Sequence, residues 1–309
     1  MIETPPKDRG LDHWADMAEL GSYWGLSFLF FVYRRLGRWP FRLALAPVVA
    51  YFLVFARGRR RISREFLYRA GVRGPLGWGV ARHFWSFAEA TLDKLVAWNG
   101  GVRVDQVDFE GREAVQALLT QGQGLLMIAS HLGNLEVCRV MASIRPGLVV
   151  HVLVHTGHAG NFNRLLRRLD PNAGVNLVQV EEFGAAQAAR LSERISAGEV
   201  VVIAGDRNPM HGGRTVEADF LGAQAPFALG PFVLAAALGC PVFLLFCLKQ
   251  KKRFRMIYEP FAGGLEVPRA GRQQVLQDTV QRYASRLQAH CLEAPYQWFN
   301  FYGFWSRQR

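Results

Sequence analysis

The sequence has 309 residues, of which 50% are hydrophobic, enough for a sizeable core in one large α/β domain or two smaller ones. Its 37 Lys and Arg residues against 25 Asp and Glu residues give a net charge of +12, which suits an anionic partner such as phospholipid, nucleic acid or an acidic carrier protein. The 4 cysteines form no CxxC pair and fit reduced, buried thiols rather than a disulfide framework.

Two apolar runs bounded by arginines dominate the first sixty residues, and no signal-peptide pattern precedes them. The runs cover 23–33 and 43–55, and neither reaches the roughly 20 residues of a bilayer span. Aromatic ends and flanking arginines are typical of helices that lie in the membrane interface. Two buried core helices, or a short tilted span by one run, are the alternatives. We therefore divide the chain into an N-terminal membrane-associating helical segment, 1–60, and an α/β domain, 61–309.

The rest of the chain alternates between strand and helix patterns. Residues 62–98 carry one apolar face and are expected to be helical. Strands are expected at 102–109, 124–129, 148–154, 175–180, 200–204, 242–248 and 254–258. Helices are expected at 112–120, 137–144, 162–169, 183–197, 227–238 and 273–291. This alternation predicts an α/β fold with a mostly parallel central sheet flanked by helices.

The stretch 130–136 carries the first candidate for chemistry. His131 follows the buried strand pattern at 124–129, and Asn134 is a plausible N-cap for the helix after it. Ligands of open α/β sheets bind where such strands end. His131 and Glu136 therefore form a candidate base and orienting carboxylate, although an acid is also favoured in the first turn of a helix by the dipole.

Three further loops follow predicted strands and are expected at the same sheet edge. Asn161 and Arg164 follow one strand, Asp206 and Arg207 follow another, and residues 220–227 form the third loop. Arginine suits phosphate or a developing oxyanion because of its planar fork.

Several other signatures are missing or weak. The chain has no Gly-x-Ser-x-Gly elbow, no P-loop and no Gly-x-Gly-x-x-Gly after a strand. His151 and His155 lie four residues apart along a strand, roughly 13 Å, which is too far to share a metal. No metal site is predicted.

The segment from His131 to Glu136 resembles the His-x4-Asp/Glu motif of the lysophospholipid acyltransferase superfamily. The fuller resemblance is to its bacterial lipid A biosynthesis branch, the lauroyl/myristoyl acyltransferase-like proteins. It rests also on the basic apolar N-terminus, on 161–164, on 219–242 and on the tail 295–299, in the same order along the chain. Asp206-Arg207 stands where many lipid A enzymes have Asp-Gln, and the end of the tail also differs, so a divergent member with another acceptor is expected.

The resemblance implies an O-acyltransferase that moves a fatty acyl group from acyl carrier protein or acyl-CoA to a hydroxyl of a lipid or lipid-like acceptor. His131 would be the general base and Glu136 would orient it. Asn134, Asn161, Arg164, Asp206 and Arg207 are expected to bind substrate. Backbone amides near Gly133 and Asn134, with Arg207, would stabilise the oxyanion.

The resemblance also implies no cofactor, and a place on the cytoplasmic face of a bacterial inner membrane, peripheral or N-terminally anchored. The basic surface suits an acidic carrier protein as donor. The alternative is a non-catalytic membrane-bound lipid-binding or assembly protein. Nucleic acid is not expected as a partner, because the basic runs flank apolar segments and no nucleic-acid-binding motif is present. The aromatic tail 296–305 either faces the membrane or closes the core.

Overall fold

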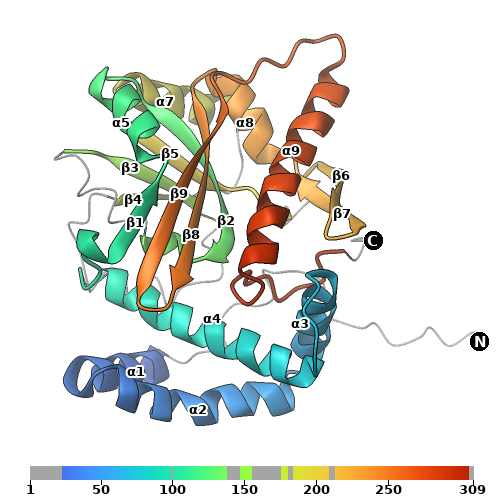
Figure 1. The fold of residues 1–309 in the computed structure, drawn as a ribbon. Helices are drawn as coiled ribbons and strands as arrows, with labels where there is room; N and C mark the ends of the chain where they lie inside the picture. Colours follow the sequence, from blue (N-terminus) through green and yellow to red (C-terminus); the bar gives the residue numbers. More distant parts are fainter. Residues whose placement is uncertain are drawn as a thin grey trace, which may run out of the picture.

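The computed structural model describes residues 23–98, 100–137, 147–154, 175–179, 184–208 and 213–305. Within these ranges the chain forms one seven-stranded sheet, a separate two-stranded hairpin and helices around them (Figure 1). The predicted helices at 137–144 and 162–169 lie largely or wholly outside the described residues.

The sheet confirms the predicted α/β class. Its strand order is β1-β9-β8-β2-β5-β3-β4, and within this sheet only the β8–β9 pair is antiparallel among the described pairs. The strands are β1 (Val107–Glu110), β2 (Leu125–Gly133), β3 (Val150–Val154), β4 (Val175–Gln179), β5 (Val200–Ala204), β8 (Val242–Gln250) and β9 (Arg253–Ala262). The central strand β2 is buried on both faces, as its unbroken apolar pattern predicts for a parallel strand.

Both faces of the sheet contribute to the core. Leu126 and Ile128 of β2 join one apolar cluster, whereas Leu125 and Met127 join the other, because successive side chains of a strand point to opposite faces. The described helices that follow β1 along the chain are α5 (Arg112–Thr120), α7 (Ala185–Ser196), α8 (Gly230–Leu238) and α9 (Arg272–Glu293).

One expected loop is a hairpin instead. Residues 220–227 were expected to be a loop, with a helix from 227, but β6 (Thr215–Phe220) and β7 (Ala223–Ala228) pair antiparallel. Leu221 and Gly222 turn the chain with positive φ, and Ala225 and Phe227 of β7 are buried. The helix starts only at Gly230, where Pro231 fits the first turn.

The N-terminal part consists of four helices: α1 (Tyr23–Leu36), α2 (Arg38–Phe55), α3 (Arg57–Arg69) and α4 (Leu76–Trp98). Figure 1 shows α4 lying across the end of the sheet, with α1 and α2 on the side of α4 that faces away from the sheet. The predicted boundary at residue 60 falls inside α3, and the division into two parts stays a prediction.

Much of α2 is exposed although the helix is apolar. Phe41, Leu45 and Val49 are buried along one face, whereas Trp39 and Leu43 are 70% and 62% exposed. Among the described helices, α2 alone is long and apolar enough to cross a membrane, by length and composition.

Candidate active site

His131 lies in the last three residues of β2, at the carboxyl end of the central strand. The sequence placed it in a loop after the strand, but β2 continues to Gly133 with a register shift between Ala129 and Gly133 against β8. Gly133 has φ +77°, and a Cβ there would lie 1.9 Å from the carbonyl oxygen of Cys247. Only glycine allows this close approach of β2 to β8.

Asp206 is the carboxylate that holds the ring of His131. Its Oδ1 lies 2.7 Å from His131 Nδ1, and its Oδ2 accepts the backbone N–H of His131 at 2.8 Å. Glu136 was predicted as the orienting residue, and for the Nδ1 atom that prediction is wrong. The physical reason is the sheet: β5 pairs parallel with β2 and Ala204 lies opposite Ala129, so Asp206, two residues after the end of β5, stands beside His131.

The turn after β5 brings Asp206 to this position. Gly205 donates its backbone N–H to the carbonyl of Ala129 at 2.8 Å, which ties the end of β5 to β2. A Cβ on Gly205 would lie 2.8 Å from both the ring of Tyr283 and a methyl group of Ile128. The packing around Gly205 therefore leaves no room for a side chain immediately before Asp206.

The C-terminal segment completes the surroundings of Asp206. Trp298 donates Nε1–H to Asp206 Oδ2 at 2.9 Å, and Asn300 donates from Nδ2 to the Asp206 carbonyl at 3.1 Å. Phe299 donates its backbone N–H to the carbonyl of His131 at 3.1 Å, so this segment runs beside the end of β2 like a short strand. Trp298 and Asn300 were not predicted as site residues, because an irregular segment carries no periodic signal.

The aromatic tail closes the core rather than facing outward. Trp298, Phe299, Phe301, Tyr302 and Phe304 are all buried. The ring of Trp298 contacts those of Phe220 and Phe304 edge to face. The tail therefore fixes the indole that donates to Asp206.

The protonation states of His131 and Asp206 suit a general base and the carboxylate that orients it. Burial is the main cause that lowers the pKa of His131, and the positive charge of Arg207 lowers it further, against the opposing effect of Asp206. For Asp206, burial would raise the pKa, but the charge and hydrogen bond of His131 together with Arg207 outweigh it and lower the pKa. At neutral pH the ring is therefore neutral and Asp206 is ionised.

These states fix the tautomer of the ring. An ionised carboxylate only accepts hydrogen bonds, so His131 Nδ1 carries the hydrogen and Nε2 keeps its lone pair. One third (33%) of the His131 side chain is exposed, whereas the Asp206 side chain is fully buried. Asp206, which the sequence predicts as a substrate-binding residue, bonds Nδ1 and so leaves Nε2 of His131 as a proton acceptor.

Arg207 lies beside this pair. Its guanidinium carbon stands 5.6 Å from the centre of the Tyr302 ring. Burial lowers its pKa, while the Tyr302 hydroxyl and Asp206 act in the opposite direction. Arg207 directly follows Asp206, which contacts the His131 ring, as expected if the loop after β5 lies at this edge of the sheet.

The expected backbone oxyanion donors are already used. Gly133 donates its N–H to the carbonyl of Gln297 at 2.8 Å, and Asn134 donates to the carbonyl of Cys247 at 2.8 Å. The prediction that these two amides stabilise an oxyanion is therefore wrong. The side chain of Asn134 donates Nδ2–H to the carbonyl of Ala90 at 3.3 Å, and its buried Oδ1 has no hydrogen-bond partner among the described residues.

Glu136 stands half-buried in a 3₁₀ turn that follows Asn134. Val137 closes this turn by donating its backbone N–H to the carbonyl of Asn134 at 3.1 Å. Asn161 and Arg164, two of the predicted substrate-binding residues, lie outside the described residues. No group of three His, Cys, Asp or Glu side chains that could hold a metal occurs in the part of the chain that the structure describes.

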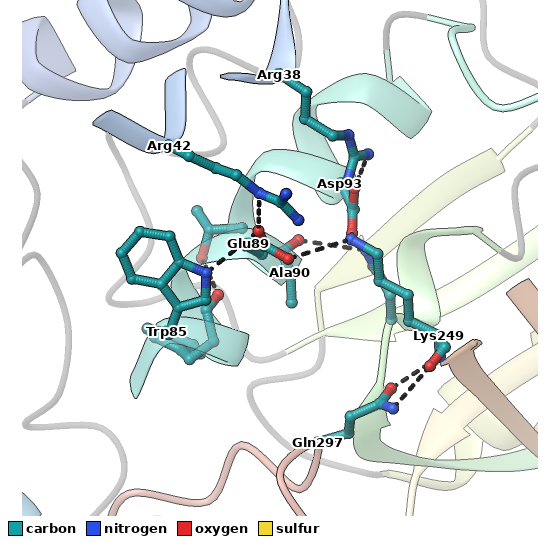
Figure 2. A network of polar contacts seen from close by, with 11 residues as sticks. Arg38, Arg42, Trp85, Glu89, Ala90, Asp93, Lys249 and Gln297 are labelled. Carbon is teal, nitrogen blue, oxygen red and sulfur yellow. Dashed lines mark hydrogen bonds and ion pairs between the residues drawn. The ribbon is translucent and has the colours of Figure 1, made fainter. Parts of the chain in front are cut away.

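A network of ion pairs ties the N-terminal helices to the edge where His131 lies (Figure 2). Asp93 of α4 is 1% exposed and pairs with Arg38 of α2 at 2.5 Å and with Lys249 at the end of β8. Glu89, one turn earlier, pairs with Arg42 at 2.6 Å. Figure 2 shows these arginines reaching from α2 toward the two carboxylates of α4.

The network continues to the segment beside His131. Gln297 accepts the backbone N–H of Lys249 at 2.8 Å and donates to its carbonyl at 2.9 Å. Gln297 is followed by Trp298, which holds Asp206. Polar contacts from α2 to Gln297, and from the next residue Trp298 to Asp206, therefore join α2 to the His131–Asp206 pair.

The sequence predicts His131, Asp206 and Arg207 at one carboxyl edge of a parallel sheet, and the carboxylate that holds the ring there is Asp206 rather than the expected Glu136. A family model, bacterial lipid A biosynthesis acyltransferase, matches residues 84–307. The chain belongs to this family. A search of the curated proteins finds no match.

Membership of the lipid A acyltransferase family confirms the resemblance and assigns the chain to lipid acyltransferases. The matched region begins inside α4 and contains His131, Asp206 and Trp298. It leaves α1, α2 and α3 outside the family match.

Proposed function

We propose that the chain is a membrane-associated O-acyltransferase that moves a fatty acyl group from acyl carrier protein or acyl-CoA to a hydroxyl of a lipid or lipid-like acceptor. The observation that supports this most is the 2.7 Å contact between Asp206 and the Nδ1 of a partly exposed His131. An alcohol is a poor nucleophile at neutral pH, so the transfer needs a base at the attacking oxygen.

In the proposed reaction, the acceptor hydroxyl gives its proton to Nε2 of His131 as its oxygen attacks the thioester carbonyl. The tetrahedral oxyanion then collapses, the C–S bond breaks, and the leaving thiolate takes the proton from the imidazolium. Asp206 stabilises that imidazolium through Nδ1. Arg207 supplies positive charge near the developing oxyanion, consistent with its effect on the pKa of His131.

The remaining predicted residues keep proposed roles. Asn134 offers a buried Oδ1 for a substrate hydroxyl. Glu136, Asn161 and Arg164 are proposed to contact the substrate or the loops around it. The strong excess of basic residues suits acidic acyl carrier protein as donor.

The N-terminal helices are proposed to hold the enzyme at a bacterial inner membrane, on its cytoplasmic face. The exposed apolar side chains of α2 support this, since large exposed apolar patches on a folded chain indicate an interaction surface. With only 17% of its residues buried, α2 is also unlike a helix from the core of a soluble protein.

The test is transfer of a labelled acyl chain by the purified full-length protein. Thioesters of acyl carrier protein and of coenzyme A are offered with extracted bacterial lipid, and lipid products are identified by mass spectrometry. Wild type should form an acylated lipid, and His131→Ala should be about 10²–10⁴-fold slower, the usual contribution of a general base. A wild-type protein that transfers no acyl chain from either donor, while still binding lipid vesicles, would favour the non-catalytic lipid-binding protein.

A further inference from the structure

A hollow lies where α2, α3 and the start of α4 meet. Its volume is about 590 Å³, within the usual range of pockets for small molecules and head groups. We call it the arginine cavity, and it is lined by Leu53, Arg57, Arg60, Arg61, Arg64, Gly77, Val80 and Ala81. None of these residues belongs to the site described above.

The arginines of the cavity share one face of α3. The spacing places the four arginines on one side of α3. Arg60 and Arg61 lie three and four residues after Arg57, and Arg64 lies four and three residues after them. Residues at these spacings share a helix face. Arg57, Arg61 and Arg64 are exposed, which leaves the cavity open to solvent.

No carboxylate of the described residues neutralises this charge. Arg60 donates to the carbonyl of Leu53, and none of the four lining arginines forms an ion pair within the described ranges. Glu65, the acid of α3, pairs with Arg69 instead.

Two exposed aromatic residues stand close in sequence to residues that line the cavity. Phe55 stands two residues before Arg57 and is 68% exposed, and Trp78 follows Gly77 and is 79% exposed. Exposed aromatic rings beside arginines are the combination found at the head-group level of a membrane.

We propose that the arginine cavity binds the phosphate-bearing head group of an anionic membrane lipid. Four arginines match the charge of phosphate, and their planar forks match its oxygens. The exposed rings of Phe55 and Trp78 would enter the acyl layer of the membrane. An acidic soluble protein has no acyl layer, so a lipid is the better occupant. The proposal rests on the proposed function only in placing the protein at a membrane.

The test measures binding of the full-length protein to vesicles made of equal parts phosphatidylglycerol and phosphatidylcholine, and to vesicles of phosphatidylcholine alone. Arg57→Gln with Arg61→Gln should weaken binding to the anionic vesicles about 25-fold, at about fivefold per arginine near an anionic surface. Binding to phosphatidylcholine vesicles should not change.

A matched control removes two arginines elsewhere. Arg269 and Arg272 are exposed and have no ion pair among the described residues, and Figure 1 shows the start of α9 at the end of the molecule opposite α3. Arg269→Gln with Arg272→Gln lowers the net charge equally and should leave vesicle binding within about twofold, since the effect of surface charge falls off within a Debye length.

A second variant tests the cavity without changing charge. A Cβ at Gly77 meets nothing within 4 Å, so the side chain of Gly77→Leu would extend into open space at the cavity wall. Leucine is also the better helix former. This variant should lose preference for phosphatidylglycerol vesicles at unchanged thermal stability.

Three results would overturn the proposal. One is equal weakening by the two arginine pairs, which would indicate general charge attraction. Another is unchanged vesicle binding together with lost affinity for acyl carrier protein, which would assign the cavity to an acidic protein. The third is binding of soluble glycerol phosphate as tight as that of the vesicles, which would indicate a free phosphate ligand.

The two proposals fail in different ways. His131→Ala should bind anionic vesicles like wild type, because His131 is not part of the cavity. Gly77→Leu should still transfer acyl chains to detergent-dispersed lipid. Loss of acyl transfer alone therefore leaves the cavity proposal intact, and loss of vesicle preference alone leaves the acyltransferase intact.

Discussion

Replacing Asp206 by Asn should disable the ring of His131 without moving it. Asp206 Oδ2 accepts two N–H groups, from the backbone of His131 and from the indole of Trp298. Both are donors, so the oxygen of an asparagine must stay at that position. The amide nitrogen is then left facing His131 Nδ1, at the 2.7 Å contact.

An amide nitrogen is a donor, so it forces Nδ1 of His131 to become the acceptor. The ring hydrogen moves to Nε2, and the lone pair that would accept the substrate proton is lost. In serine hydrolases the same reversal of tautomer costs about 10⁴-fold in kcat. We expect a loss of about 10³–10⁴-fold here, with a fall of about 2 kcal/mol in the free energy of unfolding from the lost charged hydrogen bond.

The assay is acyl transfer under saturating thioester, with urea unfolding in parallel. Glu136→Gln is the matched control, because it makes the same carboxylate-to-amide change at Glu136. Glu136 is the residue that the His-x4-Glu spacing alone predicts as the partner of His131. Asp206→Asn should lose most activity while Glu136→Gln retains the larger share. An active Asp206→Asn and an inactive Glu136→Gln would refute the assignment of Asp206 as the holder of the ring.

The remaining predictions concern pH and stability. The histidine acts as a base only while neutral, so activity should fall as the pH drops through the pKa of His131. Burial first and the charge of Arg207 second hold that pKa below its ordinary value. Arg207→Gln should therefore raise the pKa of His131 and shift the acid limb of the rate to higher pH, whereas Arg207→Lys should shift it less. Gly133→Ala should lose about 2–5 kcal/mol in urea unfolding, because its φ is +77° and the new Cβ would meet a β8 carbonyl at 1.9 Å. Asp93→Asn should lose about 3 kcal/mol in the same measurement, because it leaves the partly buried Lys249 without its buried partner.

The edge that carries the site could be predicted from the sequence, because parallel strands end on the same side of a sheet. The patterns at 124–129 and 200–204 correspond to β2 and β5, and the residues that follow them, His131 and Asp206, do meet. The role of Asp206 was missed because Glu136 is close in sequence, whereas Asp206 is 75 residues away. Sequence spacing does not reveal which strands are neighbours.

Backbone partners were also invisible in the sequence. Whether the amides of Gly133 and Asn134 are available depends on the carbonyls of Gln297 and Cys247, which arrive from distant segments. The same holds for Trp298, whose indole reaches Asp206 from an irregular segment. Propensity and periodicity describe local structure, and these contacts are set by the tertiary fold.

The most direct measurement is the titration of His131 by ¹⁵N NMR, set against the pH dependence of acyl transfer. We expect a neutral ring with its hydrogen on Nδ1, a pKa below the ordinary value of 6.5, and a rate that falls as the pH drops through the pKa of His131. A hydrogen on Nε2 at neutral pH, or a rate that does not follow the titration of His131, would contradict the assignment of His131 as the base.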